Sequence, residues 1–68
     1  MKLLDVVATK QAFPEELVDV GQIGTIVEEL DDDTVLVEFS DLNGVAYAIT
    51  PIPVAALMEL KHTPAVAA

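Results

Sequence analysis

The chain has 68 residues, with twelve acidic and three basic side chains and a formal net charge of −9 at pH 7. This length allows one small domain, and the lack of cysteine leaves no disulfide or thiolate metal site to stabilise it. A hydrophobic content of 53% excludes a disordered acidic chain, because disorder requires low hydrophobicity as well as high charge. The scarcity of Lys and Arg argues against nucleic acid as the main ligand.

The charge is concentrated in the middle of the chain. Between Lys10 and Lys61 there are eleven acids and no basic residue, so residues 11–60 carry −11. Asp5 interrupts the apolar N-terminus where a signal peptide would need an unbroken apolar run. No segment approaches the roughly 18 consecutive apolar residues of a membrane span. We therefore expect a cytoplasmic protein without a membrane partner, with one domain over residues 1–61 and a flexible tail over residues 62–68.

The N-terminal third predicts one strand and one loop. Alternating side chains from Leu3 to Ala8 favour a first strand. In the segment that follows, Pro14 can open a single helical turn that is too short to form a free helix. We expect a loop that packs Phe13 and Leu17 against the core.

Two glycines, Gly21 and Gly24, precede a run of β-branched residues and indicate a tight turn before a bent second strand. A dinucleotide-binding fingerprint would need a further glycine and then a helix, which this segment lacks. The strand continues to Leu30 and ends at an acidic turn over residues 31–33.

The clearest strand runs from Thr34 to Ser40, where Val35, Val37 and Phe39 share one face. The next four residues, 41–44, have the composition of a three-residue hairpin loop with a bulge at its glycine. This loop predicts two cross-strand pairs on the apolar face: Phe39 with Tyr47, and Val37 with Ile49.

The C-terminal part predicts one more turn and strand. Pro51 and Pro53 should end the preceding strand, because proline donates no hydrogen bond to a ladder. Residues 54–57 then favour a single helical turn, and residues 57–61 a short last strand. Five short strands bury their apolar face best by curling. We therefore expect an all-β fold: a small five-stranded SH3-like barrel with a short 3₁₀ turn before the last strand.

Four segments share a pattern with a known family: Leu3 to Ala8, Val20 to Glu28, Val37 to Phe39 and Tyr47 to Ala48. They resemble a bacterial family, the domain of unknown function numbered four-nine-two-six. The resemblance covers about residues 1–60; it implies the fold and assigns no catalytic or binding residue. The segment from Gly21 to Val27 is also similar to KOW-type and other SH3-like modules, several of which bind RNA or ribosomal partners.

Few residues offer chemistry. Ser40 is the only serine and His62 the only histidine, and their positions at a strand end and at the start of the tail do not indicate a nucleophile and base. Three consecutive aspartates, residues 31–33, do not have the alternating ligand spacing of a calcium loop. We expect no catalytic residue, no cofactor and no metal site.

Two features leave alternatives open. Strand alternation places Glu28 on the same face as Ile26, where a buried carboxylate would be a functional candidate, whereas a bulge would turn Glu28 outward. Apolar Val27, Leu36 and Met58 on the outer face are either scattered surface residues, the cover of a chain terminus, or a self-association patch.

These observations favour a non-enzymatic protein-binding module whose acidic surface docks a basic protein, for example as its accessory or neutralising subunit. One alternative is a KOW-type module that binds nucleic acid or the ribosome. Another is a purely structural homo-oligomer, such as a homodimer formed through strand edges. The residues expected to contact the basic partner are Glu28, Glu29, Asp31, Asp32, Asp33, Glu38 and Asp41.

Overall fold

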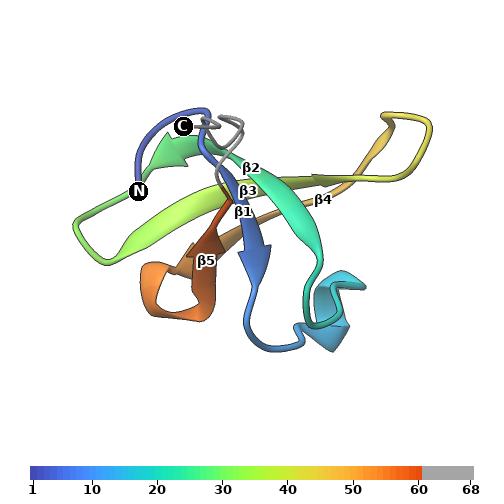
Figure 1. The fold of residues 1–68 in the computed structure, drawn as a ribbon, viewed down its shortest axis with the longest axis horizontal. Coiled ribbons are helices and arrows are strands. Elements are labelled where there is room, and N and C mark those ends of the chain that lie inside the picture. Colours follow the sequence, from blue (N-terminus) through green and yellow to red (C-terminus); the bar gives the residue numbers. More distant parts are fainter. Residues whose placement is uncertain (61–68) are drawn as a thin grey trace, which may run out of the picture.

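A computed structural model describes residues 1–60 as one antiparallel β-sheet with two short 3₁₀ turns (Figure 1). The predicted fold class is confirmed, including the 3₁₀ turn before the last strand. The predicted tail, residues 62–68, lies outside the described residues. In chain order the elements are β1 (Val6–Thr9), η1 (Pro14–Glu16), β2 (Ile23–Glu29), β3 (Thr34–Ser40), β4 (Ala46–Pro53), η2 (Val54–Ala56) and β5 (Leu57–Glu59).

The strand order in the sheet is β4-β3-β2-β1-β5. The sheet is not closed into a barrel, because β4 and β5 form its two edges and do not pair with each other. One face of the curled sheet holds the core. Its largest fully buried side chains are Val7, Ile26, Val35, Val37, Phe39, Ile52 and Leu57.

The first strand is shorter than predicted. Leu3 and Leu4 are exposed, and Leu4 has a left-handed backbone conformation with φ 70° that no regular strand tolerates. A turn holds this segment, because the amide of Asp5 donates to the carbonyl of Lys2 at 3.0 Å and the Asp5 carboxylate accepts from the Lys2 amide at 2.9 Å. The strand therefore begins only at Val6.

A bulge in β2 decides the orientation of Glu28. Ile26 pairs with Val37, but Glu28 pairs with Leu36, so β2 contains one extra residue between these pairs. The extra residue shifts the alternation and leaves Glu28 exposed. The alternative with a buried Glu28 carboxylate is wrong.

A second bulge, in β4, overturns the predicted hairpin register. The loop closes as expected, with the Asp41 amide donating to the Val45 carbonyl at 2.9 Å. Beyond the Ser40–Ala46 pair, however, β4 carries one extra residue. The predicted pairs of Phe39 with Tyr47 and of Val37 with Ile49 are wrong. The observed partners are Ala48 for Phe39 and Thr50 for Val37.

This shift turns Thr50 and Ile52 into the core and leaves Tyr47 and Ile49 exposed. The strand also continues through both prolines. It ends at Pro53 and not before Pro51, so the prediction that the prolines end this strand is wrong. An edge strand tolerates Pro51 and Pro53 because the amide on its outer side takes no part in the ladder.

The end of β1 and the segment before β2 are joined around the buried Thr9. Its hydroxyl donates to the Asp19 carbonyl at 2.6 Å and accepts from the Gln22 amide at 3.0 Å. The Thr9 carbonyl also accepts from the Gly21 amide at 2.8 Å. These bonds fix the return of the β1–β2 loop to the sheet, so this loop has a defined position beside β4.

Candidate functional site

The acidic side chains are a surface feature. Nine of the twelve are exposed, three are half-buried and none is buried. Residues 1–60 contain only two lysines, Lys2 and Lys10, which cannot neutralise twelve carboxylates. Most of the negative charge therefore faces water and is available to a cationic partner.

The seven predicted contact residues do not form one patch. Glu28, Glu29 and the aspartates of residues 31–33 gather where β2 turns into β3. Glu38 lies half-buried in the middle of β3, on the face opposite the core. Asp41 follows the far end of β3, roughly 25 Å from Asp33 at the rise of an extended strand. A single contact surface would have to span the length of β3.

Two of these aspartates hold their own turns. One Asp31 carboxylate oxygen accepts from the Asp33 amide at 2.8 Å. The corresponding Asp41 oxygen accepts from the Asn43 and Val45 amides at 2.8 and 3.0 Å. Such bonds are the reason aspartate is favoured at the start of turns. Asp31 and Asp41 thus have structural roles that the sequence analysis did not assign.

The residues considered for catalysis or metal binding do not form a site within the described part of the chain. Ser40 is exposed at the end of β3, and His62 lies outside the described residues. Within residues 1–60, no three His, Cys, Asp or Glu side chains lie close enough to hold a metal ion together.

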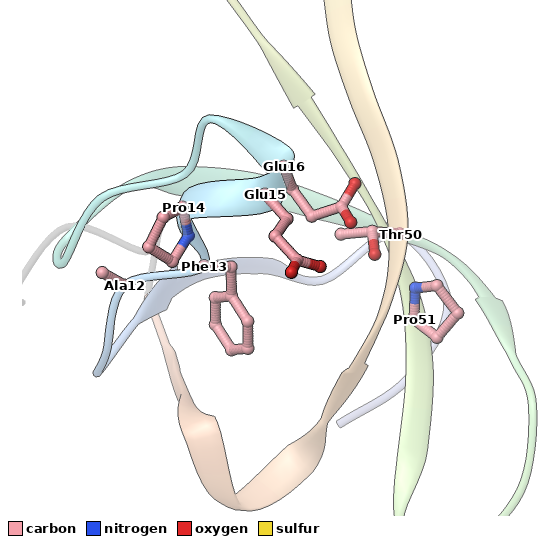
Figure 2. Close-up of a pocket in the computed structure, with 7 residues that line it drawn as sticks. All are labelled: Ala12, Phe13, Pro14, Glu15, Glu16, Thr50 and Pro51. Atoms are coloured by element: carbon pink, nitrogen blue, oxygen red, sulfur yellow. The ribbon is translucent and has the colours of Figure 1, made fainter.

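A hollow with a volume of about 510 Å³ lies between η1 and β4 (Figure 2). We call it the η1–β4 groove. It combines acidic, aromatic and proline side chains. Its lining consists of Ala12, Phe13, Pro14, Glu15, Glu16, Thr50 and Pro51.

Local sequence explains how η1 forms one wall of the groove. Pro14 begins the 3₁₀ turn, where its missing amide hydrogen costs nothing. Leu17 ends it in a left-handed conformation with φ 61°, and its amide donates to the Pro14 carbonyl at 3.1 Å. Leu17 is 78% exposed, so the predicted packing of Leu17 on the core is wrong. Phe13 is half-buried and packs against the core as predicted.

The bulge in β4 forms the opposite wall. Because β4 is shifted by one residue, Thr50 faces the core side and is 8% exposed. In Figure 2 the carboxylates of Glu15 and Glu16 extend from η1 toward Thr50 and Pro51. The two acids are adjacent in sequence and both reach the same hollow.

Sequence reasoning missed Glu15 and Glu16 as site residues. The available signal was a pair of acids directly after an aromatic residue and a proline, in a loop between two strands. That signal does not reveal the partner wall, because the position of Thr50 depends on the β4 bulge. A second, smaller hollow of about 330 Å³ contains a single acid, Glu38.

The fold and surface define an all-β module with one open five-stranded antiparallel sheet and a strongly acidic exterior. The chain belongs to the family described as Domain of unknown function (DUF4926), whose family model matches residues 3–59. This confirms the resemblance seen in the sequence. No curated protein and no solved structure gives a significant match. Among the described residues, no helix has the length and apolar character needed to cross a membrane.

Proposed function

We propose that this chain is a non-enzymatic module of the bacterial cytoplasm that binds a basic protein through its acidic surface. The observation that supports the proposal is the distribution of charge: none of the twelve carboxylates is buried and only two lysines accompany them in residues 1–60. A surface of one sign attracts partners of the opposite sign and accelerates their encounter. In this role the chain would act as an accessory or neutralising subunit.

Exposed apolar side chains provide contact area that a protein–protein interface needs in addition to charge. Charge alone gives steering and specificity, whereas affinity needs desolvated apolar contacts. The β3–β4 hairpin projects beyond the rest of the sheet in Figure 1 and carries exposed Leu42, Val45, Tyr47 and Ile49. The η1–β4 groove has apolar walls of its own.

A peptide-display selection with the purified chain tests the proposal. Random short peptides are selected at low ionic strength, and the retained sequences are compared with the starting library. We expect enrichment in Lys and Arg, and binding of the selected peptides that weakens steeply as salt is raised to physiological strength. Enrichment without basic residues, or affinity independent of salt, would contradict the proposal.

The same purified chain distinguishes the KOW-type alternative. A gel shift with structured and single-stranded RNA at low salt should show no retention, because phosphate contacts need Lys or Arg. Retention of RNA would favour the nucleic-acid alternative over the proposed one.

A further inference from the structure

We propose that the η1–β4 groove is the place where the basic partner inserts an arginine side chain. This inference rests on the proposed function and deepens it, because it names the site and the recognised group. It stands on three independent features of the groove: a pair of carboxylates, apolar walls, and a largely buried threonine side chain whose hydroxyl still reaches solvent.

The carboxylates provide charge in the right arrangement. Glu15 and Glu16 both line the groove, and Glu16 is half-buried, so part of its hydration is already removed. A guanidinium presents five donors in a planar fork and can bond two carboxylates at once. An ammonium offers a single point of charge and matches such a pair less well. No lysine lies in residues 11–60 to occupy the groove from within that segment.

The apolar walls suit the rest of an arginine side chain. Phe13 packs against the core cluster, which fixes its ring at the edge of the groove. A guanidinium stacks on an aromatic face, and its methylene stem lies along apolar surface. Pro14 and Pro51 provide this surface from opposite walls, as Figure 2 shows.

The Thr50 side chain distinguishes the groove from a surface cluster of acidic residues. Its side chain is 8% exposed, and its hydroxyl forms no hydrogen bond to another described residue. No fully enclosed side-chain oxygen or nitrogen in the described residues lacks a partner, so this hydroxyl still reaches solvent. In Figure 2 its oxygen lies between the Glu15 carboxylate and the Pro51 ring. A buried acceptor directed into the groove matches a guanidinium donor that inserts there.

We expect the arginine to arrive as part of an extended segment, because the groove is larger than one side chain. About 510 Å³ lies within the range of roughly 300–1,000 Å³ typical of ligand pockets and leaves room beside one side chain. The exposed edge strand β4 forms one wall, so a peptide can approach the groove without displacing any element.

An NMR titration of the full chain tests this assignment. The probes are the blocked pentapeptide Gly-Ala-Arg-Ala-Gly and its counterparts with lysine or citrulline in the central position, all at low ionic strength. We expect amide shifts at residues 12, 13, 15–17 and 50. Arginine should bind several-fold more tightly than lysine, and citrulline, which keeps the shape but lacks the charge, should not bind.

Two pairs of substitutions locate the contact. Changing Glu15→Gln and Glu16→Gln together should raise the Kd for the arginine peptide about tenfold or more, as expected for loss of charge-assisted hydrogen bonds. The matched control changes Asp19→Asn and Glu59→Gln, two exposed acids that neither line the groove nor belong to the predicted contact residues. It removes the same charge and should raise the Kd less than about twofold through long-range charge. Thr50→Val, which keeps the shape, should reduce the preference for arginine over lysine.

The possible failures are distinguishable. Equal weakening by both double variants, or amide shifts confined to the β2–β3 turn, would overturn the groove as the site while leaving an acidic binding surface intact. Absence of binding by both the arginine and the lysine peptide at low salt would overturn the proposed function itself. Without peptide, the amide spectrum of each variant should differ from that of the parent chain only near the substituted residues, which shows that each loss concerns binding and not folding.

Discussion

The backbone amide of Phe13 donates to the carbonyl of Val18 at 2.7 Å, and the amide of Val18 donates back to the carbonyl of Phe13 at 3.2 Å. This reciprocal pair closes the loop that contains η1. Val18 is 2% exposed and belongs to the core cluster, so one wall of the η1–β4 groove is tied directly to the core. The groove is therefore a feature of the folded sheet and not of a free loop.

Truncation of Val18 should accordingly affect both stability and the groove. We expect Val18→Ala to lower the free energy of unfolding by about 1–3 kcal/mol, since two buried methyl groups are lost and a cavity remains. Urea unfolding measures this change. The control Val20→Ala, at a side chain that is 61% exposed, should change the free energy by less than about 0.5 kcal/mol. Equal effects would contradict the anchoring role of Val18.

Gly24 has no space for a side chain. A Cβ atom there would lie 2.6 Å from Val37 Cγ1 and 2.9 Å from the Phe39 ring, both in the core. Gly24→Ala should therefore lower the free energy of unfolding by about 1–3 kcal/mol through overpacking. Gly44→Asn is the control, because its surroundings are open and asparagine tolerates the left-handed backbone with φ 80°. Denaturant unfolding of both variants should show a large effect only at Gly24.

The Thr9 hydroxyl should contribute measurably to stability. Thr9→Val keeps the shape of the side chain but removes the hydroxyl that bonds both the Asp19 carbonyl and the Gln22 amide, which then keep only their mutual bond at 3.3 Å. We expect a loss of about 1–3 kcal/mol, because two hydrogen bonds of about 0.5–1.5 kcal/mol each are removed. Thr25→Val, on β2 and with no side-chain hydrogen bond to a described residue, should be nearly neutral. Thermal unfolding compares the two variants, and similar melting temperatures would refute the assignment.

Two substitutions of Asp41 separate its structural role in the turn from the effect of its charge. Asp41→Ala removes the acceptor for the Asn43 and Val45 amides and should cost about 0.5–1.5 kcal/mol. Asp41→Asn keeps an oxygen in that position while removing the charge, so its stability should equal or exceed that of the parent chain. If both variants lose the same stability, charge and not the turn is responsible. Chemical denaturation at moderate salt makes the comparison.

Salt should change folding and binding in opposite directions. The carboxylates repel one another, and the Debye length shrinks to about 10 Å at 0.1 M salt, so added salt should raise the melting temperature. The same screening should weaken binding to basic peptides. Asp32→Lys, at the centre of the acidic turn, should raise the melting temperature at low salt and flatten its salt dependence. A melting temperature that falls with salt would show that the acids are not in net repulsion.

Strand bounds were predicted correctly where buried and more exposed side chains alternate strictly along the chain. The segment from Thr34 to Ser40 has the predicted bounds because Val35, Val37 and Phe39 face the core while their neighbours do not. Local turn chemistry was also informative: the Asp41–Val45 closure is observed as expected. These features depend on residues within a few positions of one another, so the sequence contains them directly.

The features that sequence reasoning missed depend on distant parts of the chain. No local signal places an extra residue at Tyr47, because a bulge in β4 is favoured only when Ile52 and Thr50 can then face the core. The same bulge brings Thr50 to the groove. Glu15 and Glu16 lie next to β4 because Thr9 and Val18 fold the loop back. The hydrogen bonds of the Thr9 hydroxyl reach across ten and thirteen residues. The candidate site thus follows from tertiary packing.

The two prolines of β4 bear on how this chain behaves at high concentration. An open sheet exposes a row of backbone donors at its edge, and such a row is a template on which a second chain can add a strand and a fibril can grow. Pro51 and Pro53 remove two of those donors from the last half of β4. A strand from another copy would find an uninterrupted set of donors only along residues 46–50. The prolines thus limit β4 as a template for amyloid-like assembly, although the strand is apolar and uncharged.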